Sequence, residues 1–171
     1  MKEHTGPVLF VVAHFLVFEG KRAVMERISW NRYFVEITRL IAQRSTCVEE
    51  KMGATIVKDR RILTTGYSGA PKGLAHCLDI GCLREKMRIA KGEKIEICRG
   101  LHAIQNALIQ AAIFGVKIGD STIYTTHPPC ILCAKMLINI GIEKIVIIEG
   151  IPQGLARDLL EEGKIDIKSC P

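Results

Sequence analysis

The spacing of apolar and polar residues predicts a helix followed by two strands in the first half of the chain. After Ser29, apolar residues recur every three or four positions from Trp30 to about Arg44, which predicts an amphipathic helix capped by Ser29. Residues 53–59 and 61–67 are short segments rich in β-branched and apolar residues. They predict two antiparallel strands joined by a tight turn.

The second half of the chain alternates between helical and strand patterns. The predicted elements are a helix over 101–114, a strand over 121–126, a helix through Ile140, a strand over 144–149, a helix over 154–162 and a strand over 164–168. Pro129 stands at a favourable first-turn position of the second of these helices, and Gly141 ends it. We therefore predict a three-layer α/β/α sandwich whose mixed sheet of about five strands begins with a hairpin and continues in parallel.

Two segments do not fit this alternation. Residues 68–100 carry several glycines and cysteines without a clear period, and a loop of this length is usually functional or pinned by another group. Near the N-terminus, the apolar run Val8–Phe18 is shorter than the roughly 20 residues of a membrane span and lacks signal-peptide features. It suits an added strand or a partner-binding segment, but we favour a third hypothesis, that translation begins at Met25. The domain organisation is then an extension over 1–28 and one domain over 29–171.

Composition agrees with a single globular domain. The 171 residues are 48% hydrophobic and 25% charged, and the net charge is +6. This charge suits an anionic partner such as a nucleotide. The charges are scattered and aromatic residues make up 5% of the chain, which disfavours nucleic acid as the partner.

One histidine and one Cys-x-x-Cys pair stand at the starts of apolar helical patterns. His102, Cys130 and Cys133 provide three ligands with an open fourth position, as a catalytic zinc requires. Alternatively, the Cys pair is a redox pair or half of a structural site, and His102 packs in the core. An odd total of seven cysteines favours metal over disulfides, and free thiolates imply a reducing compartment, hence the cytoplasm.

The position two residues after His102 departs from the chemistry that these ligands indicate. Zinc nucleobase deaminases read H-x-E…P-C-x-x-C, where the Glu carries protons and is not a ligand. Here this position holds Ile104, which carries no proton. General acid–base catalysis contributes roughly 10²–10⁴ in rate, so we expect activity to be crippled while zinc binding persists.

A second group of potential ligands lies in and before the long stretch 68–100. It consists of Cys47, Cys77, Cys82 and Cys98, hereafter the four-cysteine group. Four thiolates can close a tetrahedral structural zinc site that pins this stretch against the first helix, with His76 as an alternative ligand. The other interpretation is four buried free thiols.

Over about Trp30 to Leu160 the chain resembles the cytidine/deoxycytidylate deaminase superfamily, and within it the deoxycytidylate (dCMP) deaminases. The matching segments are Arg44–Cys47, Gly53–Ala54, Gly66–Pro71, His76–Cys77, Gly81–Glu85, Cys98–Ala103, Gln105–Ala107 and Pro129–Lys135. The resemblance implies a cytidine-deaminase-like sandwich and the conversion of dCMP to dUMP and ammonia, in pyrimidine metabolism. The water on a zinc held by His102, Cys130 and Cys133 would attack the ring carbon that bears the amino group.

The resemblance also implies substrate contacts, effectors and assembly. Ser68 and Ala103 are implied as substrate-binding positions, although the family has Asn where this chain has Ser68, which predicts weaker binding of the sugar. The family implies a second zinc with ligands at the positions of Cys47 and Cys77. It further implies homo-oligomers and regulation by dCTP and dTTP with magnesium.

Two rival functions remain. One is a deaminase of adenosine in tRNA or of cytosine in single-stranded nucleic acid, which the cysteine-bearing stretch and the scarcity of aromatic residues disfavour. The other is a regulatory subunit or pseudoenzyme that binds nucleotide without converting it, which Ile104 favours. An engineered change, a naturally inactive relative and a sequence error would each place Ile104 at this position.

Overall fold

The computed structural model describes residues 27–90 and 92–170. The predictions for the apolar run Val8–Phe18 and for a start at Met25 lie outside these residues.

The first predicted helix is present. Helix α1 spans Trp30–Ala42, so it ends slightly before the expected Arg44. Ser29 caps it as predicted, because its side chain accepts a hydrogen bond from the backbone N–H of Arg32 at 3.2 Å. Its buried residues include Phe34 and Val35, which pack against the sheet.

The two predicted strands form an antiparallel hairpin. Strand β1 spans Gly53–Lys58 and strand β2 spans Arg61–Tyr67. Asp59 and Arg60 between them have φ angles of 51° and 61°, and a two-residue turn with both residues left-handed matches the twist of the flanking strands.

Every helix and strand predicted for the second half is also present. They are α4 Ala103–Phe114, β3 Thr122–Thr125, α5 Ile131–Ile140, β4 Lys144–Ile147, α6 Gly154–Glu162 and β5 Asp166–Ser169. The sheet order is β2-β1-β3-β4-β5, in which β1 is antiparallel to β2 and β3, while β3, β4 and β5 are parallel. The mixed five-stranded sheet is therefore confirmed.

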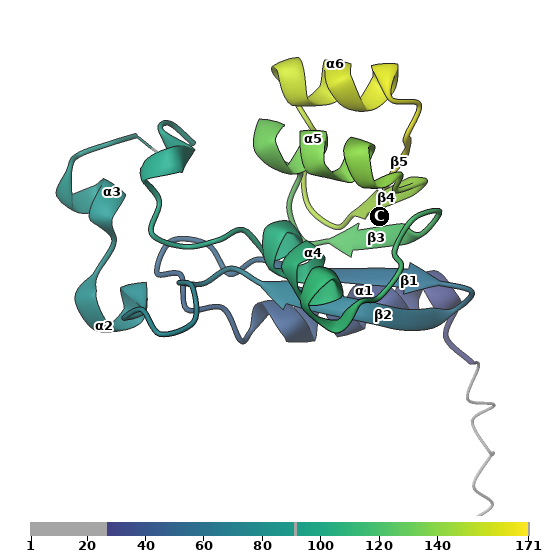
Figure 1. Cartoon of the computed structure of the whole chain (residues 1–171), viewed down its shortest axis with the longest axis horizontal. Coiled ribbons are helices and arrows are strands. Elements are labelled where there is room, and N and C mark those ends of the chain that lie inside the picture. The colour runs from purple at the N-terminus through teal and green to yellow at the C-terminus, as the bar shows by residue number, and fades with distance from the viewer. Residues whose placement is uncertain (1–26, 91, 171) are drawn as a thin grey trace, which may run out of the picture.

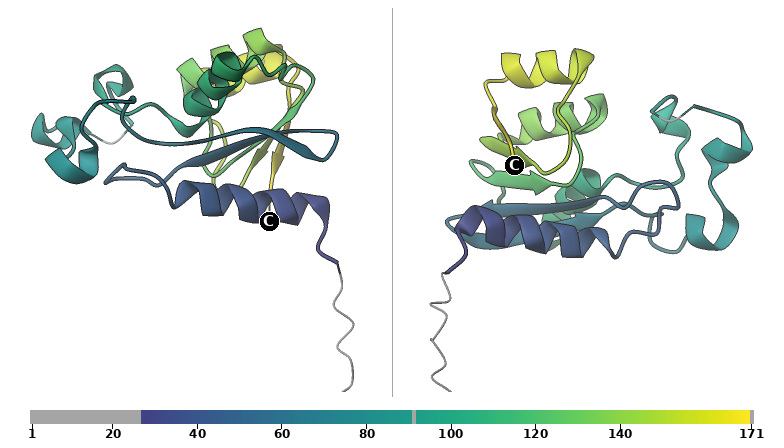
Figure 2. Two further views of the ribbon diagram at one scale, coloured as in Figure 1. Left: turned by 60° about the horizontal axis from the view of Figure 1, so that its bottom comes forward. Right: turned by 180° about the vertical axis from the view of Figure 1, so that it is seen from behind.

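The sheet separates two layers of helices (Figures 1 and 2). Helix α1 covers one face, and α4, α5 and α6 lie on the other. Each face has its own apolar cluster: Phe34 and Tyr124 belong to the α1 side, whereas Ile56, Leu137 and Leu160 belong to the opposite side. The predicted three-layer α/β/α sandwich is confirmed.

Residues 68–100 are not the plain loop that the sequence suggested. They contain the short helices α2 Cys77–Ile80 and α3 Leu83–Lys86 and the 3₁₀ turn η1 Ile95–Ile97. Figure 1 shows α2 and α3 projecting beyond the sandwich. Elements of about one turn are too short for a 3.6-residue period to show in the sequence. Hereafter residues 68–100 are the projecting segment.

Candidate metal centre

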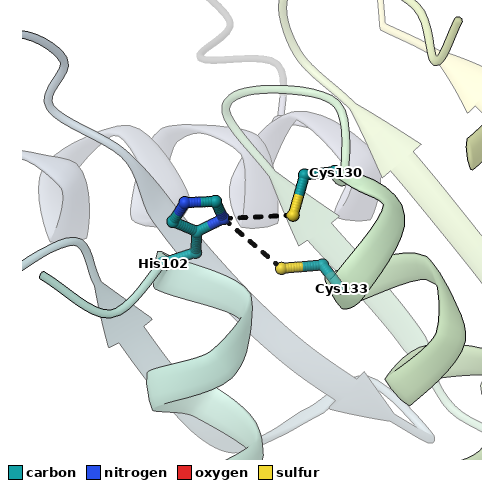
Figure 3. A group of neighbouring side chains, drawn as sticks. All are labelled: His102, Cys130 and Cys133. Carbon is teal, nitrogen blue, oxygen red and sulfur yellow. Dashed lines mark hydrogen bonds between the residues drawn. The ribbon is translucent and has the colours of Figure 1, made fainter. Parts of the chain in front are cut away.

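Three predicted ligands meet at the starts of two neighbouring helices (Figure 3). His102 is the N-cap residue of α4 and Cys130 is the N-cap residue of α5, so the two helix starts place Cys133 beside them. His102 Nδ1 lies 3.4 Å from Cys130 Sγ and 3.6 Å from Cys133 Sγ. We call these three residues the first ligand set.

Local interactions fix where both helices begin. The side chain of Gln105 accepts a hydrogen bond from the backbone N–H of His102 at 2.8 Å, which closes a capping box at the start of α4. Cys130 has extended backbone angles, φ −71° and ψ 171°, before α5 begins. The prediction for Pro129 was wrong in detail: because Cys130 is the cap, the proline precedes the cap and does not lie in the first turn.

The two thiols of the first ligand set titrate as a pair. Cys133 is 1% exposed and Cys130 is half-buried. The hydrogen bond from the Cys133 thiol, helped by His102, lowers the pKa of Cys130 to about 4. The same hydrogen bond, together with burial, raises the pKa of Cys133. One thiolate is therefore ready at neutral pH, and a bound cation favours the second.

The donors of the first ligand set fit zinc. One imidazole nitrogen and two sulfurs whose ligand atoms all lie within 4.8 Å of one another match the N/S ligands of a three-protein-ligand zinc site. Within residues 27–90 and 92–170, this is the one group of three or more His, Cys, Asp or Glu residues that meets this distance.

Ile104 lies directly beside the first ligand set. It is 3% exposed and lines a small cavity of about 20 Å³ together with all three ligands. No carboxylate side chain of the described residues lines this cavity. His127 also lines it, but its Nδ1 is 3.1 Å from the Thr126 hydroxyl and its Nε2 is 3.9 Å from the Glu149 carboxylate, so both nitrogens have other neighbours.

A larger cavity of about 240 Å³ opens next to the first ligand set. His102 and Cys130 line one part of it, and the projecting segment lines another. Its charged lining residues are Glu49, Glu50 and Arg84. A concave site next to metal ligands, with a few charged groups in an otherwise apolar wall, is the usual form of a small-molecule site.

Ser68 lines the larger cavity, but its hydroxyl already has protein partners. Its Oγ accepts a hydrogen bond from the backbone N–H of Met52 at 3.1 Å and lies 2.7 Å from Ser45 Oγ and 3.2 Å from the carbonyl of Glu50. Ala103 is 3% exposed at the start of α4. Their roles in binding substrate stay predictions.

The members of the four-cysteine group are neighbours, but less tightly gathered than the first ligand set. Cys77 and Cys82 are buried, while Cys47 and Cys98 are half-buried. The pKa of Cys77 is raised, mainly by burial and then by the negative charges of Cys47, Cys98 and Cys82. No three of these sulfurs in the described chain lie within 4.8 Å of one another. The predicted structural zinc stays a prediction.

His76 lies apart from the cavity where three of these cysteines meet. It lines a surface groove together with Tyr67 and Asn106. Cys47, Cys77 and Cys98 instead line the larger cavity. This placement favours Cys47, Cys77 and Cys98 over His76 as ligands.

Arg84 is the cavity residue that sequence reasoning missed. The segment Gly81–Glu85 stood among the matching segments, but nothing in its spacing indicated that Arg84 would line the same cavity as His102 and Cys130.

In the described part of the chain, no helix is long and apolar enough to cross a bilayer.

Comparison with known proteins points to one family. The model of the cytidine and deoxycytidylate deaminase zinc-binding region matches residues 28–149. ComE operon protein 2 of Bacillus subtilis is 40% identical over 145 residues, which cover 84% of this chain and 72% of that protein. Deoxycytidylate deaminase of Schizosaccharomyces pombe is 35% identical over 121 residues, 70% of this chain and 37% of that protein.

A solved structure shares the fold over most of both chains. The dCMP deaminase of cyanophage S-TIM5, in complex with dCMP and dUMP, aligns with a TM-score of 0.67 at 26% identity. The alignment covers 85% of this chain and 99% of the phage chain.

Proposed function

The chain belongs to the cytidine and deoxycytidylate deaminase family, and from this premise we propose that its first ligand set holds zinc and its larger cavity binds dCMP. Efficient conversion of dCMP to dUMP and ammonia requires proton transfer, which Ile104 cannot provide. The phage relative with the same fold was solved with dCMP and dUMP, which supports this choice of nucleotide. We also propose that residues 29–171 form the deaminase domain.

The geometry supports the binding half of this proposal. A zinc ion held by His102, Cys130 and Cys133 would polarise a water molecule for attack on the base. Leu101 and Pro128 form part of an apolar wall of the cavity beside the ligands. The capping hydrogen bond at the start of α4 positions His102, whose Nδ1 is directed at the two sulfurs.

The observation that carries the catalytic half is the position of Ile104. Its side chain is buried against the first ligand set, where a proton carrier would have to stand to serve both the water and the base. A hydrocarbon side chain neither accepts nor donates a proton. Ile104 belongs to the apolar cluster, where a hydrocarbon side chain is favourable for stability, but it supplies no acid–base group.

The test is ammonia release from dCMP by the zinc-loaded chain, compared with Ile104→Glu and Ile104→Gln. We expect Ile104→Glu to raise the rate by about 10²–10⁴, since it restores the acid–base group. Ile104→Gln has a similar shape without an ionisable proton, so it should stay near the rate of the unmodified chain. Equal rates for all three would contradict the assigned role of Ile104.

A second function, nucleotide binding without turnover, is favoured by the same residue. If the unmodified chain regulates other proteins or senses nucleotides, thermal unfolding should shift upward with dCMP, or with dCTP or dTTP and magnesium, while no ammonia appears. We propose dCTP and dTTP as effectors and a homo-oligomer as the assembly on the basis of family resemblance alone.

We further propose that the four-cysteine group holds a structural zinc. The pKa of Cys77 is raised by burial and by the charges of the three other cysteines, so the four thiols are close neighbours with the donor chemistry of such a site. The cation would offset the repulsion among their thiolates. Metal analysis of the unmodified chain should then give two zinc ions per chain, whereas the free-thiol interpretation gives one.

A further inference from the structure

The projecting segment contributes one positive side chain to the larger cavity. Among the described residues that line this cavity, Arg84 is the one permanently cationic side chain. It comes from α3, whereas His102 and Cys130 come from the sandwich. We propose that Arg84 binds the 5′-phosphate of the nucleotide, an assignment that rests on the proposed function.

One nitrogen of the Arg84 guanidinium has a hydrogen-bond partner in the protein, and another has none. Its Nη2 donates a hydrogen bond to the carbonyl of Ala90 at 2.7 Å, which fixes the orientation of the fork. Its Nε is buried and has no hydrogen-bond partner. A buried N–H without a partner is unfavourable, and an oxygen of a bound ligand removes that cost.

A phosphate suits this geometry better than other nucleotide groups. Guanidinium donors form a rigid fork that matches phosphate oxygens, and such charge-assisted hydrogen bonds are about twice as strong as neutral ones. The base must approach His102 and Cys130 for deamination, so the opposite end of the nucleotide is the part that can reach the projecting segment. Arg84 therefore distinguishes a nucleotide from the free nucleoside.

The other charges in the cavity limit how much negative charge it accepts. Glu49 is exposed, so water screens its carboxylate, and Glu50 is already engaged in an interaction of its own. One cation against two carboxylates suits a single phosphate better than a triphosphate. The inferred ligand is thus a nucleoside monophosphate and not a triphosphate.

The test uses calorimetric titration of the full zinc-loaded chain with dCMP and, separately, with deoxycytidine. Arg84→Gln removes the charge, Arg84→Lys keeps the charge without the fork, and Arg88→Gln removes a charge from an exposed residue of the same segment that does not line the cavity. We expect Arg84→Gln to weaken dCMP binding by about 10- to 100-fold and to leave deoxycytidine binding unchanged. Arg84→Lys should give a smaller loss, and Arg88→Gln none.

Deoxycytidine binding also reports whether each variant is folded. If Arg84→Gln no longer binds deoxycytidine, the test relies on Arg84→Lys instead. A ratio of dCMP to deoxycytidine affinity in Arg84→Lys equal to that of the unmodified chain then overturns the inference. If folded Arg84→Gln keeps the ratio of dCMP to deoxycytidine affinity of the unmodified chain, the inference is overturned as well. This holds even if the variant has lost zinc from the four-cysteine group. If the unmodified chain binds neither ligand, the proposed function fails and the inference fails with it.

Discussion

The two cysteine-bearing regions of this molecule differ in what holds their sulfurs. The first ligand set stands at the starts of α4 and α5, which pack on the sheet, and its sulfurs lie within 3.6 Å of one imidazole nitrogen. Three members of the four-cysteine group, Cys77, Cys82 and Cys98, lie in the projecting segment, whose helices are about one turn long. Ligands on packed elements are arranged by the fold, whereas ligands on a loosely supported segment depend on the metal to gather them.

The largest expected effect comes from removing a ligand of the packed region. In an Ile104→Glu background, Cys133→Ser should lower ammonia release by more than about 100-fold, because changes beside a zinc ligand already cost about 10- to 100-fold. Metal analysis should show the loss of one zinc. Because Cys133 belongs to the core that α5 shares with α4 and α6, the free energy of unfolding of the variant is measured beside the rate to show that it is folded. Retained activity with normal zinc content would show that these residues are not the ligands.

The pH dependence of zinc affinity should be the next largest difference between the two regions. Cys130 has a pKa of about 4 and is ionised at neutral pH, whereas the pKa of Cys133 is raised, so zinc must displace about one proton from the pair. Zinc affinity of the first ligand set should therefore rise about tenfold from about pH 7 to about pH 8 and fall as pH decreases. Zinc binding by the four-cysteine group requires four thiolates against two in the first ligand set, so it should release more protons and depend more steeply on pH. Zinc competition with a chromophoric chelator at several pH values measures both slopes, and equal slopes would contradict the comparison.

A smaller, local effect is expected from the projecting segment. Cys77→Ser should remove the second zinc and raise the rate of proteolytic cleavage within residues 68–100 by about fivefold, because local opening there becomes easier. The free energy of unfolding of the sandwich should change little, since Cys77 belongs to neither apolar cluster. Mass spectrometry of the first cleavage products measures this. Unchanged cleavage and a single zinc in the unmodified chain would favour the interpretation as free thiols.

The sandwich was largely readable from the sequence because its elements have clear periods and end signals. Ser29 capped α1 as expected, and Gly141, with φ of 80°, ends α5. The start of α5 was misplaced slightly, because Cys130 is its N-cap and Pro129 precedes it. The one-turn helices of the projecting segment were not readable, because a single turn leaves no pattern.

The parts of the candidate site that depend only on residue type could be predicted from the sequence. Histidine and cysteine at two predicted helix starts indicated a metal site, and Ile104 indicated that a proton carrier is missing. Ser68 was predicted to contact substrate, but its hydroxyl is engaged by Met52 and Ser45, and no sequence pattern indicated these contacts. The role of Arg84 was equally hidden, because it depends on how a distant segment folds over the cavity.

The sequence by itself determined the order and type of the main elements, the ligand chemistry and the absence of an acid–base group at position 104, because these follow from local pattern and side-chain chemistry. Only the tertiary structure decided which distant residues share a cavity. It alone brought His102 within 3.4 Å of Cys130, buried Ile104 beside them and placed Arg84 in the same cavity with an unpartnered Nε. The physical reason is that such contacts join residues far apart in the chain, and packing of the whole sheet, not local preference, sets their distances.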